Sequence, residues 1–287
     1  MFKPSDLVLG KYTVVRMLYR TALSNVYQAV NVKANRIYLL KEYVGFYAKR
    51  MKNYQLLQQL DHSAIPKIEE VIQTSNGFLV IQEYFEGEDL LSILRRNGAQ
   101  KEEDVIWWAK QLCEALSYLH SQQPPLVFGK VCPENIFLRS DGRIALIKFD
   151  SMHAERAFEV DDLIVPLLGF SGYHAPEHYG FYSKIDSRAD IYGLGATLSE
   201  LVTWQRPRNA LFAVTPIREF NPLLSTKLEW IIQKCTQHNP DDRFQSCEEL
   251  LAALSPDDLP NQKPKKGLQR VFESLKVQRG MRRKRLE

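Results

Sequence analysis

The chain has 287 residues, of which 45% are hydrophobic and 25% are charged. These proportions are typical of a globular protein and exclude the disordered, collagen-like and fibrous classes. No apolar stretch approaches ~18 residues, so no transmembrane helix is expected, and the N-terminal residues lack the apolar run of a secretory signal. Four widely spaced cysteines without a CxxC pair argue against a zinc site and a disulfide framework, and a reducing cytoplasm is the expected location.

The net charge of +4 is the sum of two unlike regions. Residues 261–287 contain ten lysines and arginines against two glutamates, a charge of +8, so the remaining 260 residues carry −4. The sequence therefore consists of a mildly acidic body and a basic tail.

The first third of the chain has the pattern of strands around one helix. β-Branched and aromatic residues predict strands at 12–18, 25–30 and 36–43, and leucines at helical spacing predict a helix within 46–60. Two more strands are predicted at 68–72 and 78–84, joined through Asn76-Gly77, a hairpin signal.

From residue 90 the pattern becomes helical. Apolar side chains between 105 and 119 recur on one helical face, which predicts a core helix. Residues 256–266 contain three prolines and three lysines and are typical of a linker. The coarse expectation is a strand-rich lobe followed by a helical lobe.

Seven segments resemble, in order and at normal spacing, the eukaryotic-like Ser/Thr protein kinases of bacteria. These segments are 25–29, 60–66, 83–90, 133–135, 172–177, 190–195 and 239–243. The resemblance covers roughly residues 10–255 and implies an α+β fold with two lobes, at 1–84 and 85–255, followed by the linker and basic helix of 256–287. It also implies a structural ion pair between Glu177 and Arg243.

The resemblance does not extend to the catalytic residues, which need a glycine loop, a lysine–glutamate pair and two aspartates. Tyr19, Thr21 and Ser24 occupy the three glycine positions, where glycine allows the backbone to approach phosphates. Lys41 retains the strand lysine, but its helical partner position is Asn53, and no acid occurs between Glu42 and Asp61.

Two charge reversals follow in the large lobe. Lys130 stands where the family has its substrate-orienting aspartate, and Lys148 stands where it has its metal-binding aspartate. At ~4 Å and an effective dielectric near 20, an ammonium repels Mg²⁺ by roughly 8 kcal/mol. Only Asn135 remains of the metal ligands, with Asp150 as a weak additional candidate. Both lysines could instead form local ion pairs or reach solvent.

Other substitutions concern apolar packing. By resemblance, Leu57, Phe128 and Phe149 form a fully apolar spine. Val26, Leu39 and Phe137 take the positions that sandwich adenine, and the larger Leu39 and Phe137 are expected to fill that volume. If a nucleotide bound, the family positions that would contact it are Lys41, Val26, Glu83, Phe85 and Asn135.

The tail has an apolar stripe at helical spacing, formed by Leu268, Val271, Phe272 and Leu275, followed by a run of basic residues to 285. A basic amphipathic helix can lie on anionic membrane, bind an acidic partner or contact nucleic acid. It can equally pack its stripe on the body. Nucleic acid is disfavoured because no aromatic residues alternate with the charges.

The sequence therefore predicts a pseudokinase, a kinase-like protein without catalysis that acts as a scaffold or allosteric partner, with an active kinase or a signalling complex as candidate partners. No cofactor is expected. One alternative is an atypical ATP- and Mg-dependent transferase that uses Lys41, Asn135 and Asp150. A second alternative is a membrane or nucleic-acid adaptor that works through residues 268–285. The activation-segment region, 151–171, is a further candidate interaction surface.

Overall fold

The computed structural model describes residues 1–21, 23–45, 48–154, 156–157, 172–179, 184–207 and 214–255. Its chain divides into two compact units. The first unit contains Met1–Glu86 and a returning segment, Ala145–His153; the second contains Gly87–Ile144 and the described residues from Ala154 onward. Within the described ranges, no helix combines the length and apolarity needed to cross a bilayer.

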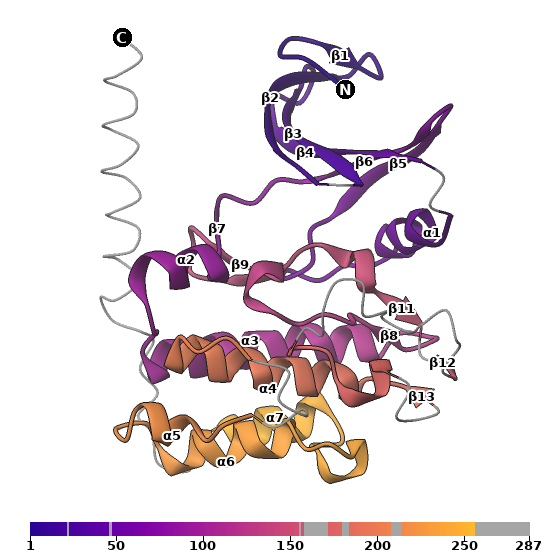
Figure 1. Cartoon of the computed structure of the whole chain (residues 1–287). Coiled ribbons are helices and arrows are strands. Elements are labelled where there is room, and N and C mark those ends of the chain that lie inside the picture. The colour runs from indigo at the N-terminus through magenta and orange to yellow at the C-terminus, as the bar shows by residue number, and fades with distance from the viewer. Residues whose placement is uncertain are drawn as a thin grey trace. The chain divides into compact units, whose positions relative to one another are not determined.

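The first unit is built on an antiparallel sheet with the strand order β1-β2-β3-β4-β6-β5 (Figure 1). Its elements are β1 (Leu7–Val8), β2 (Tyr12–Arg20), β3 (Ser24–Asn31), β4 (Ile37–Val44), α1 (Ala48–Leu57), β5 (Ile68–Thr74) and β6 (Gly77–Glu83). Five strands and the helix match the predicted positions; the short β1 was not predicted.

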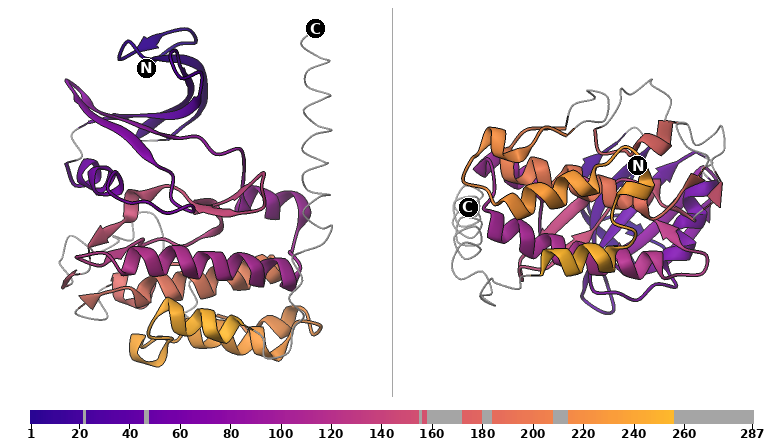
Figure 2. Two further views of the ribbon diagram at one scale, coloured as in Figure 1. Left: turned by 180° about the vertical axis from the view of Figure 1, so that it is seen from behind. Right: turned by 90° about the horizontal axis from the view of Figure 1, so that it is seen from below.

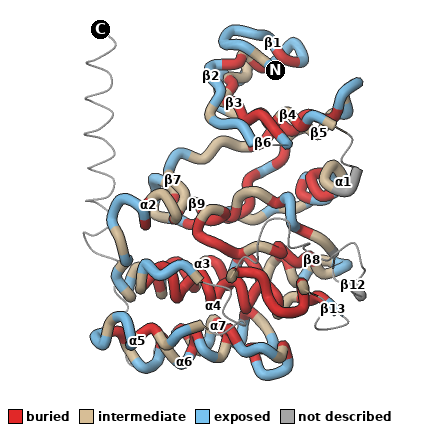
Figure 3. The backbone as a smooth tube through the Cα atoms, viewed as in Figure 1, coloured by how far each residue is buried: buried red, intermediate tan, exposed pale blue. Residues whose placement is uncertain are grey.

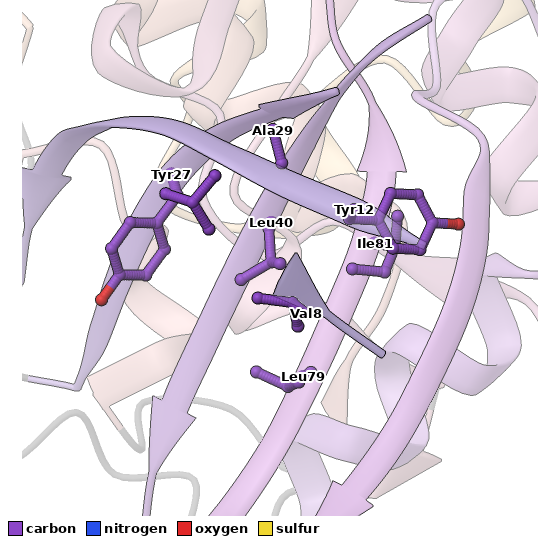
Figure 4. Close-up of a cluster of buried hydrophobic side chains, with 8 residues drawn as sticks. Val8, Tyr12, Tyr27, Ala29, Leu40, Leu79 and Ile81 are labelled. Carbon is purple, nitrogen blue, oxygen red and sulfur yellow. The ribbon is translucent and has the colours of Figure 1, made fainter. Parts of the chain in front are cut away.

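Side chains from five strands form the core on one face of this sheet (Figure 4). The β-branched and aromatic residues that predicted strands alternate along the chain, so every second one points to this face. The cluster consists of Val8, Tyr12, Val14, Tyr27, Ala29, Leu40, Leu79 and Ile81. The added strand β1 pairs antiparallel with β2 and contributes Val8, which extends this core.

The hairpin between β5 and β6 differs slightly from the prediction. Its turn lies at Ser75 and Asn76, and Gly77 is already the first residue of β6. Gly77 has φ +153°, and a β-carbon there would overlap the carbonyl oxygen of Tyr43 on β4. Glycine is therefore required because β4 and β6 approach each other closely at this point.

The second unit is mainly helical. Its elements are β7 (Gly87–Asp89), α2 (Leu90–Asn97), α3 (Glu102–His120), β8 (Leu126–Val127), β9 (Ile136–Arg139), β10 (Ile144–Leu146, which crosses into the first unit), β11 (His153–Ala154, whose first residue belongs to the first unit), β12 (Arg156–Ala157), β13 (Lys184–Ile185), α4 (Arg188–Thr203), α5 (Ile217–Phe220), α6 (Thr226–Cys235) and α7 (Cys247–Leu254). The predicted helix over 105–119 is the centre of α3.

Helix α4 forms the centre of this unit. All its residues from Ala189 to Val202 are buried, as the red tube in Figure 3 shows. It contacts α3 on one side and α6 on the other, and α7 packs along α3 (Figure 2). Gly195 has no side chain because a β-carbon there would overlap Cys235 of α6. The apolar periodicity of these helices thus produces a layered helical core.

Candidate functional site

Lys41 lies at the centre of a buried polar chain in the first unit. Its side chain is 4% exposed, and its ammonium donates a 3.1 Å hydrogen bond to the Tyr54 hydroxyl. The Tyr54 and Tyr43 hydroxyls are 2.8 Å apart, and Tyr43 donates to Asp150 Oδ1 at 2.9 Å. Because each phenol has one proton, Tyr54 must donate to Tyr43. We call these four residues the Lys41–Asp150 chain.

Three separate elements bring these side chains together. Lys41 and Tyr43 are two residues apart on β4, so both point to the same face of the sheet. Tyr54 comes from α1, and Asp150 comes from the 3₁₀ turn Phe149–Ser151, which contacts α1. Tyr54, which accepts the hydrogen bond from Lys41, directly follows Asn53 in the sequence. Asn53 is the position at which the family has its glutamate.

Burial and neighbouring charges set the protonation of this chain. Burial, partly offset by the attraction of Asp150 and reinforced by the repulsion of Lys148, lowers the pKa of Lys41 from 10.5 to about 8. Burial is also the main cause that raises the pKa of Tyr43 and of Tyr54 well above 10.0. Near neutral pH the phenols therefore remain protonated and act as hydrogen-bond donors.

Two further contacts join α1 to the returning segment. Arg50 Nε lies 2.9 Å from Asp150 Oδ1 as an ion pair without hydrogen-bond alignment, and its guanidinium is 5.7 Å from the centre of the Tyr43 ring. Asn53 Nδ2 donates to the carbonyl oxygen of Met152. Asn53 thus uses its amide to hold the backbone of the turn, a role that a glutamate could not perform.

The turn between β2 and β3 is closed by its own hydroxyl groups. The Thr21 N–H donates to the Ser24 carbonyl at 2.8 Å, and Thr21 Oγ1 accepts from the N–H groups of Leu23 at 3.2 Å and Ser24 at 2.9 Å. These amides occupy the place where a glycine loop would present free N–H groups to phosphates. Here they are hydrogen-bonded within the turn.

A pocket of about 260 Å³ lies inside the first unit between this turn and the Lys41–Asp150 chain. It is lined by Tyr19, Thr21, Leu23, Ser24, Val26, Lys41, Tyr43, Arg50, Lys148 and Asp150. Three of these side chains are cationic and one is anionic. The pocket wall therefore favours anions over a metal cation.

The catalytic-loop positions lie in the second unit and have local partners. Lys130 Nζ is 2.9 Å from Glu134 Oε1, one helical turn away in sequence. Asn135 is 4% exposed and its Nδ2 donates to the Lys130 carbonyl at 3.0 Å. Among the described residues, no group of three or more His, Cys, Asp or Glu side chains is arranged to hold a metal ion.

The expected spine residues are all interior. Leu57 and Phe149 are each 1% exposed in the first unit, and Phe128 is 1% exposed in the second. The expected adenine neighbours differ in burial: Val26 is buried on β3 and lines the pocket, whereas Leu39 on β4 and Phe137 on β9 are half-buried.

The hinge positions Glu83 and Phe85 are also half-buried, and Glu83 accepts the Lys67 N–H at 3.4 Å. The filling of an adenine volume by Leu39 and Phe137 stays a prediction.

Glu177 and Arg243 form the bidentate ion pair expected from the resemblance. Their two N···O distances are 2.7 and 2.9 Å, and the side chains are 1% and 0% exposed. The guanidinium also donates to the carbonyls of Gln237, His238 and Arg188. Every donor of this buried cation thus has an acceptor.

Tyr43, Tyr54 and Arg50 are the site residues that the sequence reasoning did not identify. The alternation along β4 places Tyr43 beside Lys41, and this signal was available in the sequence. Nothing in the sequence indicated that Tyr54 would replace an acid. Two predicted interaction surfaces, residues 155 and 158–171 of the activation segment and residues 268–285, lie outside the described residues.

Comparison with known proteins identifies relatives of this architecture. A family model described as the protein kinase domain matches residues 12–254. The serine/threonine-protein kinase PrkC of Bacillus subtilis is 26% identical over 267 residues, which cover 86% of this chain and 40% of PrkC. A probable inactive serine/threonine-protein kinase of Dictyostelium discoideum is 25% identical over 260 residues, covering 83% of this chain and 21% of that protein.

A solved structure agrees with these matches. The crystal structure of the Mycobacterium tuberculosis PknI kinase domain superposes with a TM-score of 0.70 at 24% identity, over 88% of this chain and 98% of that one. The predicted protein-kinase-like fold is thereby confirmed. The chain spans less than half the length of PrkC and of the Dictyostelium protein.

Proposed function

The chain belongs to the protein kinase domain family, and on that premise we propose that it does not transfer phosphate and acts instead through contacts with other proteins. Its place would be the cytoplasm, as a scaffold or allosteric partner of a signalling complex. The observation that carries this proposal is the Lys41–Asp150 chain.

In an active member of the family, the strand lysine pairs with a helical glutamate and contacts the nucleotide phosphates. Here the Lys41 ammonium has a phenol as its hydrogen-bond acceptor, and that phenol is bonded onward to Tyr43 and Asp150. A phosphate that recruited Lys41 would have to break this buried chain. Unmade hydrogen bonds of this kind cost about 1–3 kcal/mol each.

The residues present do not fit a catalytic magnesium ion. The Asp150 carboxylate accepts from Tyr43 and is paired with Arg50, while Lys148 lines the same pocket. In the second unit, Lys130 takes the place of the substrate-orienting aspartate and is paired with Glu134. We therefore derive no phosphoryl-transfer step through a metal.

The test is thermal unfolding with 1 mM ATP, with and without Mg²⁺ or Mn²⁺, followed by an assay of radioactive phosphate transfer. We expect a shift in Tm of less than ~1 °C and no labelled product. A ligand with a Kd of 10 μM would stabilise the protein by about 2.7 kcal/mol at 100 times its Kd. That corresponds to roughly 5–10 °C for a chain of this size.

If the protein is instead an ATP- and Mg-dependent transferase, a different result is expected. A metal-dependent shift that is lost in Asp150→Asn and Asn135→Ala, together with labelled product, would contradict the proposal. A shift without metal and without labelled product would retain the inactive assignment and identify the cationic pocket as a polyanion site.

The scaffold role needs a separate test in the native cell. Asp150→Asn and Lys41→Met remove groups that the transferase alternative requires for chemistry, whereas a function through contacts requires them only for folding. If the protein works through contacts, a deletion strain should be complemented by both variants as well as by the wild type. Loss of complementation by variants that fold with a near-normal Tm would contradict a scaffold role.

A further inference from the structure

One end of the second unit exposes apolar and acidic side chains together. Leu223 is 93% exposed and Phe220 is 47% exposed, whereas the helix residues that pack inward here, such as Ile217 and Leu228, are 0–1% exposed. Glu102, Glu103 and Glu219 lie at the same end. We call these five residues (Glu102, Glu103, Glu219, Phe220 and Leu223) the end patch.

Hydrogen bonds connect the segments that carry the end patch. Both carboxylate oxygens of Glu102, at the start of α3, accept from Ser225, its N–H at 2.9 Å and its hydroxyl. Ser225 is the N-cap of α6 and follows Leu223 by two residues. Glu229 of α6 accepts the Arg218 N–H of α5 at 2.9 Å. Figure 1 shows α5 and the first turn of α3 at the same end of this unit.

The two segments that carry the end patch, 101–104 and 217–229, have a negative net charge. They contain five carboxylates (Glu102, Glu103, Asp104, Glu219 and Glu229) and three basic side chains (Lys101, Arg218 and Lys227), a net charge of −2. A single exposed leucine is ordinary on a protein surface, but Leu223 and Phe220 are both exposed and lie three residues apart in the sequence, next to these carboxylates. Such a surface suits a ligand that is apolar on one side and basic on the other.

The chain leaves the described structure beside this end. Helix α7 ends at Leu254, and the Ser255 carbonyl accepts from Lys227 Nζ at 3.0 Å, in the first turn of α6. Residues 256–267 then separate Ser255 from Leu268. Twelve extended residues reach roughly 40 Å, so the following segment can reach the end patch without strain.

The sequence of that segment has the required chemistry. Leu268, Val271, Phe272 and Leu275 form one stripe, and ten basic residues against two glutamates give residues 261–287 a charge of +8. We propose that residues 268–285 dock on the end patch of their own chain, with the apolar stripe on Phe220 and Leu223 and the basic side chains toward Glu102, Glu103 and Glu219. This inference does not depend on whether the protein is catalytically inactive.

The test is hydrogen–deuterium exchange of the full chain, read on peptides from 268–276. A short tether gives an effective concentration in the millimolar range, so a contact with a Kd of ~0.1 mM slows exchange about 10-fold. We expect that slowing in the wild type and its loss in Leu223→Glu and in Phe272→Asp. Raising the salt from 0.1 to 1 M should weaken it, since the Debye length falls from about 10 Å to 3 Å.

Val32→Glu is the matched control, since Val32 is 52% exposed on the first unit, and it should leave tail exchange unchanged. Leu223→Ser serves as a milder second variant and should also lose the slowing. Exchange that is fast in the wild type, or equally slow in wild type and Leu223→Glu, would overturn the proposal. So would slowing that appears only with phosphatidylglycerol vesicles or with DNA, which would assign the tail to those partners.

Discussion

The second unit holds a buried pair of opposite charges, Glu177 and Arg243, whereas the first unit buries a lysine among phenols. Glu177 and Arg243 satisfy each other and leave no donor of the guanidinium unpaired. Asp190 likewise accepts the N–H groups of Phe128 and Gly129 at 2.8 Å, and lies 2.9 Å from His120. Lys41, by contrast, has a neutral acceptor and a lowered pKa.

This difference separates two kinds of family position: those whose partners lie within the fold, and those whose partners in the family are ligands. The paired charges that hold the helical layers together are retained. Removing one partner of such a pair would leave a buried charge without a counter-charge. By the resemblance, most positions that contact nucleotide or metal are changed, since lysines 130 and 148 replace aspartates, while Lys41 and Asn135 are retained. In the first unit, the side chains in contact with Lys41 and Asp150 are Tyr43, Tyr54 and Arg50.

The largest effect is expected from breaking the pair in the second unit. Glu177→Gln leaves the Arg243 guanidinium buried without a counter-charge, so the free energy of unfolding should fall by about 3–5 kcal/mol. Urea unfolding measures this change. Glu88→Gln is the control, because Glu88 pairs with Arg96 at the surface and should cost about 1 kcal/mol or less. Equal effects at the two positions would contradict the comparison.

A smaller effect is expected in the first unit. Tyr54→Phe removes the acceptor of Lys41 and the partner of Tyr43 with almost no change in volume. The free energy of unfolding should fall by about 1–3 kcal/mol. Tyr38→Phe on β4 is the control, because no hydrogen bond of the Tyr38 hydroxyl is found among the described residues, and its effect should stay within about 0.5 kcal/mol. A neutral Tyr54→Phe would show that the phenols do not stabilise Lys41.

The smallest effect is a pH dependence that belongs to Lys41. The pKa of Lys41 is about 8 in the folded protein and 10.5 in the unfolded chain. Between these two pH values the unfolded chain binds more protons, so the free energy of unfolding rises with pH. Between pH 8 and 9.5 the rise amounts to about 1–2 kcal/mol. Lys41→Met should lack it.

Other groups titrate in the same pH range, so the contribution of Lys41 is measured as the difference between the wild type and Lys41→Met. Burial raises the pKa of the Cys113, Cys235 and Cys247 thiols, which makes stability fall with rising pH in wild type and variant alike. Subtracting the two urea-unfolding profiles isolates Lys41. Lys52→Met on the exposed face of α1 should reproduce the wild-type profile; identical profiles for all three proteins would show that Lys41 is not desolvated.

Much of the fold was accessible from local sequence. The strands β2 to β6 and helices α1 and α3 follow from apolar alternation and helical periodicity, which depend on neighbours a few residues apart. The start of β6 at Gly77 was placed one residue late, because the need for glycine there arises from Tyr43 on another strand. The short β1 escaped prediction because two paired residues carry no periodicity.

The sequence by itself determined which chemical groups are present: lysines at 130 and 148, no acid on α1, and the motif spacing that specifies a kinase fold. Only the tertiary structure decided which group accepts the hydrogen bond of the retained Lys41. Its acceptor comes from a helix 13 residues away, and the chain of bonds ends on Asp150, 107 residues from Tyr43. Hydrogen-bond partners of a buried charge are chosen by proximity after folding, and no local pattern encodes that proximity.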